Sequence, residues 1–145
     1  MQKIMFDTHV FDKLPKVIEK VKEKININFE LYVTSLQVEE ISNIPDSKKE
    51  KRCRNMIMLT DLRAKLVPTS VFILGKSRLN YGRLGTGEVY KKILNISRNN
   101  VNDAVIADTS VFEECILVTD DKELFNKMKK NGYQVLDFET FMKSI

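Results

Sequence analysis

Short apolar runs rich in β-branched residues recur along this chain, and stretches with helical periodicity separate them. Five such runs predict strands at residues 3–6, 31–33, 71–74, 116–119 and 134–136. They are largely apolar rather than alternating, which is typical of strands covered on both faces. Strands that alternate with helices favour a parallel sheet between two helical layers. The sequence therefore predicts an α/β fold, a three-layer α/β/α sandwich around a mainly parallel sheet.

The segments between these runs have the spacing of amphipathic helices. In the first of them, apolar residues recur at helical intervals from Val10 to Val21. Further helices are predicted at residues 35–44, 48–66, 88–96, 102–114 and 121–130, with a short one from Phe138. Asn131-Gly132 is a good signal for the end of the helix before it. Because the chain has 145 residues and neither repeat nor linker, we expect one domain over residues 1–145.

Two properties of the chain bear on its location and partners. No apolar run approaches the ~20 residues that cross a bilayer, and the N-terminus lacks the pattern of a signal peptide. We therefore expect a cytoplasmic protein that does not contact membranes. The net charge of +4 permits a polyanionic partner but does not require one.

Few residues could support nucleophilic or zinc chemistry. His9 is the single histidine, and Cys53 and Cys115 are the two cysteines. This set is too small for a disulfide framework, for a Cys/His zinc site or for a histidine-activated nucleophile. Any chemistry should therefore depend on carboxylates.

Acidic residues follow the predicted strands. Asp7 ends the first strand, Asp120 and Asp121 follow the fourth, Glu40 lies in the helix after the second, and Asp103 begins the helix that leads into the fourth. Ligands of parallel sheets bind beyond the carboxyl ends of the strands, so these side chains are expected to converge. Clustered carboxylates repel each other unless a cation neutralises them, and Mg²⁺ or Mn²⁺ prefers oxygen ligands. The pattern predicts a site for one of these ions.

Each acid also has a purely structural explanation. Asp120 with Glu123 matches a capping box, Asp103 suits a helix N-terminus, and Asp7 could cap the first helix. Asp108 shares a helical face with apolar residues, and we expect it at the exposed edge of that face. If it is buried instead, it needs a partner.

Four segments resemble the motifs of PIN-domain ribonucleases: Asp7-Thr8, residues 34–41 (TSLQVEEI), residues 102–107 (NDAVIA) and residues 117–122 (LVTDDK). In this alignment the acids of the later motifs are Glu40, Asp103 and Asp121. Residues 132–136 are similar to the final strand of the family. The match covers residues 1–42 and 100–141, and its most specific part is residues 102–122.

The resemblance implies an endonuclease that cuts single-stranded RNA with Mg²⁺ or Mn²⁺, built on a five-stranded parallel sheet. Asp7, Glu40, Asp103 and Asp121 would be the catalytic residues and metal ligands, with Thr8 and Thr119 as substrate contacts. It also implies a toxin with an antitoxin protein as partner, and a homodimer. The segment 48–66, which contains Met56 and Ile57, has more apolar surface than one core face needs.

The middle of the chain departs from the family pattern. Residues 81–87 form a glycine-containing loop that is not a P-loop, since no Gly-Lys-Ser/Thr follows its glycines. Basic residues surround the loop, and Lys76 and Arg83 are candidates for contacts to substrate phosphates. A solvated basic surface explains them equally well.

Helical geometry separates Glu40 from its neighbour Glu39. Leu36, Glu40 and Ile44 lie nearly above one another on the apolar face, whereas Glu39 belongs to the polar face. An acid on the inward face needs a partner, and a cation can provide one. Glu40 is therefore the predicted functional acid.

Three other functions are compared with the sequence pattern. A phospho-acceptor receiver domain would need an acidic pair after the first strand and a lysine after the fifth, and the chain has neither. A PIN-like module that binds partners without catalysis and a related metal-dependent DNA nuclease remain alternatives.

Overall fold

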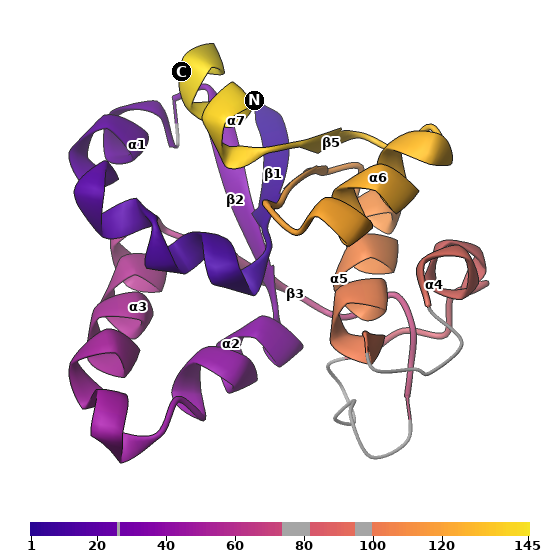
Figure 1. Cartoon of the computed structure of the whole chain (residues 1–145), viewed down its shortest axis with the longest axis horizontal. Coiled ribbons are helices and arrows are strands. Elements are labelled where there is room, and N and C mark those ends of the chain that lie inside the picture. The colour runs from indigo at the N-terminus through magenta and orange to yellow at the C-terminus, as the bar shows by residue number, and fades with distance from the viewer. Residues whose placement is uncertain (26, 74–81, 95–99) are drawn as a thin grey trace.

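The computed structural model describes residues 1–25, 27–73, 82–94 and 100–145. Its centre is a five-stranded sheet in the order β3-β2-β1-β4-β5, and every neighbouring pair is parallel. The strands are β1 (Gln2–Phe6), β2 (Phe29–Thr34), β3 (Lys65–Val67), β4 (Ile116–Val118) and β5 (Val135–Leu136). Helices flank the sheet on both sides (Figure 1), so the predicted α/β sandwich is confirmed.

Seven α-helices are present within the described residues: α1 (Ile18–Lys24), α2 (Ser35–Ser42), α3 (Lys49–Asp61), α4 (Glu88–Ile93), α5 (Val101–Phe112), α6 (Lys122–Lys130) and α7 (Phe138–Ser144). They form two layers because successive side chains of a strand point to opposite faces of the sheet. Ile4 and Phe6 of β1 enter a core with residues of α1, α3 and α7. Met5 enters a second core with residues of α4, α5 and α6.

The third strand is not where the sequence predicted it. Residues 71–73 are not in a strand, and residue 74 lies outside the described residues. The strand is instead Lys65–Val67, which pairs in parallel with β2. The prediction of a helix over 48–66 was correspondingly too long, since α3 ends at Asp61. Lys65–Val67 is a short edge strand whose residues continue the helical spacing of the segment before it. The predicted helix was therefore extended into this strand.

A left-handed residue ends α3 without a glycine. Arg63 has φ 51°, and Ala64 N donates to Leu59 O while Arg63 N donates to Thr60 O. This is the Schellman arrangement, which most often uses glycine at that position. Gly132 ends α6 in the same way, as the sequence predicted. Glu114, with φ 58°, does the same for α5, two residues before β4.

The first predicted helix is divided into three short ones. Two 3₁₀ helices, Thr8–Asp12 (η1) and Leu14–Lys16 (η2), precede α1. Pro15 has no N–H to donate to Phe11, so a continuous α-helix cannot pass through it. The predicted apolar face is nevertheless inward, since Val10, Leu14 and Val21 are fully buried.

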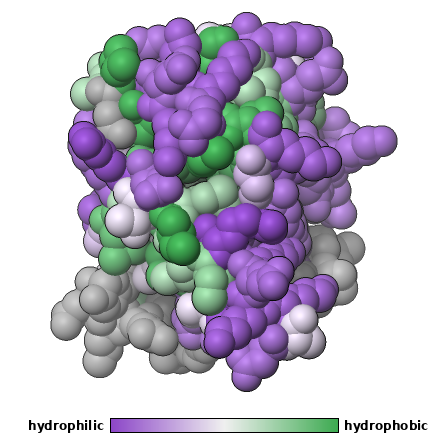
Figure 2. Space-filling view, turned by 90° about the vertical axis from the view of Figure 1, so that its left-hand side faces the viewer, coloured by the Kyte–Doolittle hydropathy of each residue, from purple (hydrophilic) through white to green (hydrophobic). Residues whose placement is uncertain are grey.

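The outer surface of α3 carries part of the apolar excess expected there. Met58 and Leu59 are buried, whereas Met56 and Ile57 are 36% and 60% exposed. Figure 2 shows the face with α1 and α3, where apolar side chains interrupt a mostly hydrophilic surface. Both cysteines are free thiols, Cys53 exposed and Cys115 buried. No helix among the described residues is long and apolar enough to cross a membrane.

Candidate functional site

The sheet has a switch point between β1 and β4. From β1 the chain runs outward through β2 to β3, then crosses back to β4 on the other side of β1. Connections leave the two central strands in opposite directions, which opens a crevice at their carboxyl ends. Asp7 follows β1, and the segment Thr119–Asp121 follows β4, so both lie at this crevice.

Asp7 is buried there and fixed by a threonine. It is 3% exposed, and the Thr119 hydroxyl donates to its carboxylate at 2.9 Å. The same hydroxyl accepts from the Asp121 N–H at 3.1 Å. Burial raises the pKa of Asp7 above its ordinary value, although the Thr119 bond opposes this. Thr119 thus couples Asp7 to the turn that carries Asp121.

Glu40 reaches the site from α2. Thr34 and Gln37 form a capping box that starts this helix at the end of β2, and the Gln37 amide donates to Phe6 O at the end of β1. The Glu40 carboxylate accepts from the Thr8 hydroxyl at 2.5 Å and from the Asn102 amide at 2.6 Å. Its inward orientation agrees with the sequence prediction. These two bonds join the loop after β1 to the start of α5.

Asp103 lies in the first turn of α5, and the other acids affect its ionisation. Burial, followed by the charges of Asp7, Asp121 and Glu40, raises the pKa of Asp103 to about 6. A nearby His9 acts in the opposite direction. Asp7, Asp121 and Glu40 therefore all lie close enough to Asp103 to disfavour its ionised form.

The oxygen donors suit a hard divalent cation, but their positions do not yet enclose one. Among the described residues, no three acidic, histidine or cysteine side chains are arranged so that they could together hold a metal ion. Asp121 uses one oxygen to cap α6 through the Leu124 N–H. Coordination by all four carboxylates would require side-chain rotation, which partly exposed Asp103 and exposed Asp121 can undergo.

Two hollows flank Asp7. The first extends between η1, α2 and α3 and is lined by Asp7, Thr8, His9, Asp12, Glu40, Ile41, Ile44, Lys51, Asn55 and Asp103. The second lies towards β4 and is lined by Asp7, His9, Val10, Lys13, Asp120 and Asp121. Asp7 and His9 belong to both hollows. Glu40 and Asp103 line only the first hollow, and Asp121 lines only the second.

Three of the four predicted substrate contacts lie among the described residues, each in different surroundings. Thr119 is fully buried and hydrogen-bonded to Asp7, so it positions that carboxylate. Thr8 is half-buried and donates to Glu40. Lys76 lies outside the described residues. The remaining candidate, Arg83, pairs with Glu113 at 2.7 Å, with its guanidinium 5.1 Å from the Phe112 ring centre.

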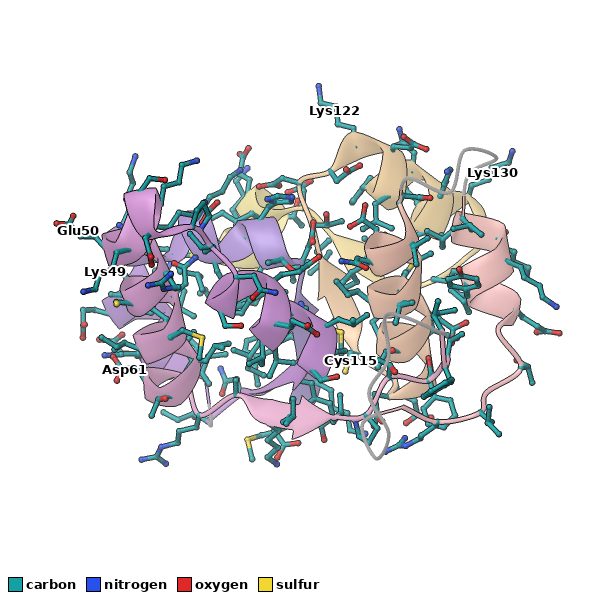
Figure 3. All side chains as sticks on the ribbon, turned by 90° about the horizontal axis from the view of Figure 1, so that it is seen from below. Lys49, Glu50, Asp61, Cys115, Lys122 and Lys130 are labelled. Atoms are coloured by element: carbon teal, nitrogen blue, oxygen red, sulfur yellow. The ribbon has the colours of Figure 1, made fainter. Side chains whose placement is uncertain are left out.

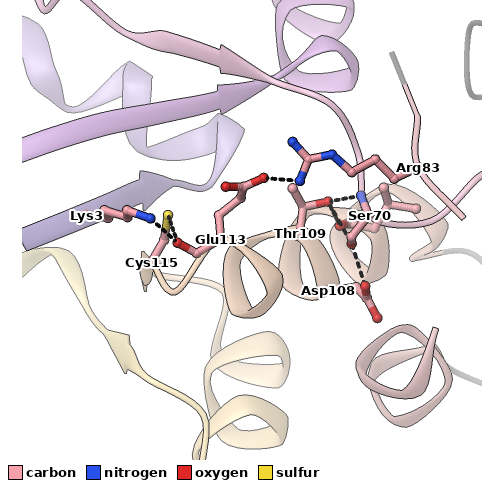
Figure 4. Close-up of polar contacts among 8 residues, drawn as sticks. Lys3, Ser70, Arg83, Asp108, Thr109, Glu113 and Cys115 are labelled. Atoms are coloured by element: carbon pink, nitrogen blue, oxygen red, sulfur yellow. Dashed lines mark hydrogen bonds and ion pairs between the residues drawn. The ribbon is translucent and has the colours of Figure 1, made fainter. Parts of the chain in front are cut away.

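This ion pair places Arg83 beside Glu113, at the C-terminal end of α5 (Figure 4). Glu113 and Asp103 lie at opposite ends of α5, about 15 Å apart at ~1.5 Å per residue. The basic loop prediction is therefore not supported for Arg83 at the acidic site, and its charge is already neutralised by Glu113.

Two of the structural explanations were wrong. Asp120 does not cap α6, because Asp121 is the capping residue; Asp120 instead pairs with Lys13 and accepts from Phe138 N. Asp108 is not at an exposed edge. It is 6% exposed and accepts from the Ser70 hydroxyl at 2.5 Å and from Tyr90 N at 2.8 Å (Figure 4).

Asn102 and Gln37 were missed as candidates for positioning the acids. Asn102 holds Glu40, while Gln37 ties α2 to β1. Both lie inside the segments that resemble the family motifs. The signal in the sequence that could have identified them was an amide side chain close to an acidic residue. Their partners are distant in sequence, so only the folded chain identifies them. No family model matches this chain, and no curated protein is significantly similar to it.

Proposed function

We propose that the chain is a metal-dependent endonuclease that hydrolyses phosphodiester bonds of single-stranded RNA, as its resemblance to PIN-domain ribonucleases implies. The observation that supports this most is that partly buried Asp103 lies near three other carboxylates: burial, followed by the charges of Asp7, Asp121 and Glu40, raises its pKa to about 6. Such a concentration of negative charge opposes folding unless a cation balances it. Perturbed carboxylates in a crevice are typical of functional sites.

Asp7, Glu40, Asp103 and Asp121 would hold Mg²⁺ or Mn²⁺. The ion would supply positive charge for the phosphate and lower the pKa of a bound water. The protein's own contribution is to fix the carboxylates. Thr119 orients Asp7, while Thr8 and Asn102 orient Glu40.

The test is incubation of labelled single-stranded RNA and DNA with the protein, in Mn²⁺, in Mg²⁺ and in chelator. We expect metal-dependent cutting of RNA, and Asp7→Asn and Asp103→Asn should abolish it while the protein stays folded. Removing a ligand should cost more than ~10²-fold in rate, because the charge stabilisation of the ion is lost. Cutting that persists in chelator would refute metal dependence. Cutting of DNA alone would favour the DNA nuclease, and binding without cutting would favour the non-catalytic module.

Glu40→Gln with Glu39→Gln as its matched control sharpens the test. Both changes remove one charge from neighbouring positions of α2, but of the two only Glu40 lines the hollow beside Asp7. Glu40→Gln should abolish cutting and weaken Mn²⁺ binding in calorimetry, whereas Glu39→Gln should change little. Equal losses of cutting in the two variants would contradict the assignment of Glu40 alone to the inward face of α2.

An antitoxin protein and a homodimer remain predictions from the resemblance. The exposed Met56 and Ile57 on α3 are the surface on which either would depend. Light scattering that gives a monomer mass at high concentration would refute the homodimer.

A further inference from the structure

A third hollow continues the row along the carboxyl edge of the sheet. It lies beyond Asp121, next to β5, and is lined by Thr119, Asp120, Lys122, Phe125, Asn126 and Asp137. It shares Asp120 with the second hollow, which in turn shares Asp7 and His9 with the first. The three hollows are therefore linked in succession by shared lining residues, and Asp7 and Asp121 line the middle one. A row of this kind suits an extended polymer better than a small molecule.

The third hollow contains an aromatic ring that the core does not bury completely. Leu124 and Met128 are the buried residues of α6, and Phe125 lies beside them, half-buried. The Lys129 ammonium lies 5.7 Å from the centre of the Phe125 ring. A partly exposed ring with a nearby cation is typical of sites where bases of single strands stack.

Polar side chains of the same helix surround this ring. Lys122, Phe125 and Asn126 are separated by three and four residues, so they share one face of α6. Lys122 is exposed and extends away from the body of the protein (Figure 3). Asn126 is exposed as well, and its amide can both donate and accept. Together they offer a cation for a phosphate and an amide for a base edge.

The carboxylates of the hollow are already engaged. Asp120 pairs with Lys13, and Asp137 caps α7 through the Thr140 N–H. Their remaining negative charge would still disfavour a phosphate deep in the hollow. A base carries no net charge, and its N–H groups can donate hydrogen bonds to carboxylates. The hollow therefore fits a base, with its phosphate outside near Lys122.

We propose that this hollow binds one unpaired base of the RNA strand, stacked on Phe125, with Asn126 at the base edge and Lys122 at the adjoining phosphate. The inference rests on the proposed function, because the cleaved phosphate is placed at the acids. It adds the substrate contact that makes a single strand the preferred ligand. A base within a duplex is already stacked on both faces and cannot lie on the ring.

The experiment compares Phe125→Leu with Phe112→Leu by fluorescence anisotropy of a labelled single-stranded RNA. Phe112 is a matched control, since it is 52% exposed, also has a cation over its ring, and lies at the far end of α5. All variants carry Asp7→Asn so that no strand is cut during the measurement. Phe125→Leu should raise Kd by about tenfold, the effect of losing one stacked base, and Phe112→Leu should not.

Two further measurements isolate stacking from general damage. Phe125→Tyr should restore the affinity, and an RNA with abasic positions should bind wild-type and Phe125→Leu proteins equally. Equal Kd values for the Phe125→Leu and control proteins would overturn the inference, even if the protein cuts RNA. So would the absence of measurable binding. If the protein binds in a Phe125-dependent manner but cuts nothing, the base site stands and the nuclease proposal fails.

Discussion

The elevated pKa of Asp103 predicts how the stability of the protein changes with pH. Burial and three neighbouring carboxylates raise that pKa from 3.8 to about 6, so the folded protein favours the neutral acid. The contribution of Asp103 to stability is therefore fully present below about pH 4 and is lost as the pH rises through about 6. Asp103→Asn is neutral at every pH. The variant should be more stable than wild type near pH 8, with little difference near ~pH 4.

The size of the effect follows from the shift. About two pKa units correspond to about 3 kcal/mol if the group is fully shielded from solvent. Because Asp103 is only partly buried, solvent screening reduces the expected gain to about 1–2 kcal/mol. For a domain of this size, that is a rise in Tm of roughly 3–6 °C. Differential scanning calorimetry in chelator, at several pH values, measures it directly.

Asp137→Asn is the control with the opposite sign. The Thr140 N–H bond lowers the pKa of Asp137, so this residue adds stability above its unfolded pKa and loses it as the pH falls. Its replacement should therefore not stabilise the protein near neutral pH. A Tm gain for Asp103→Asn that is equal at low and high pH would refute the electrostatic reasoning, as would a loss at both. Saturating Mn²⁺ should reverse the order, because it stabilises the wild type more than a variant that lacks a ligand.

Three further predictions concern the rest of the molecule. Asp108→Ala leaves the buried Ser70 hydroxyl and the Tyr90 N–H without their acceptor, and should cost about 2–3 kcal/mol in urea unfolding; an unchanged midpoint would contradict it. Gly85→Ala brings a Cβ to 2.3 Å from Ser70 O, so Tm should fall measurably, by an amount that reflects ~1–3 kcal/mol of overpacking. Arg83→Ala should leave the slope of log affinity against log salt unchanged, whereas a slope flatter by ~0.7 would place Arg83 on a phosphate.

The central strands and the edge strand β5 were predictable from the sequence, while the other edge strand, β3, was not. The strands at 3–6 and 116–119 are buried between two layers, so their composition alone identifies them. Lys65–Val67 is an edge strand with Leu66 50% exposed, and it follows α3 after three residues. Its short length and polar neighbours leave no strand pattern. The helix end before it depends on Arg63 in a left-handed conformation, which composition does not reveal.

Asp7 and Asp121 could be placed from the sequence because they follow strands, whereas the side chains that orient the acids depend on long-range contacts. Asp7 could be placed at the sheet edge from one element alone. The Thr119 bond to Asp7 joins residues 112 positions apart, and the Asn102 bond to Glu40 joins residues 62 positions apart. Thr8 and Thr119 were expected to touch substrate, yet both donate to carboxylates. A hydroxyl beside an acid in sequence does not reveal which of these roles it has.

Helix capping and the helix dipole account for some of the acids of the site but not for all of them. Asp121 does cap α6, and that bond accounts for its position. Asp7 precedes η1 but makes no side-chain capping bond. Asp103 lies in the first turn of α5, where the helix dipole alone would lower its pKa. Its pKa is raised instead, so the surrounding burial and repulsion outweigh the dipole. Capping and the macrodipole therefore leave Asp7 and Asp103 unexplained, and a bound cation would oppose the raised pKa of both.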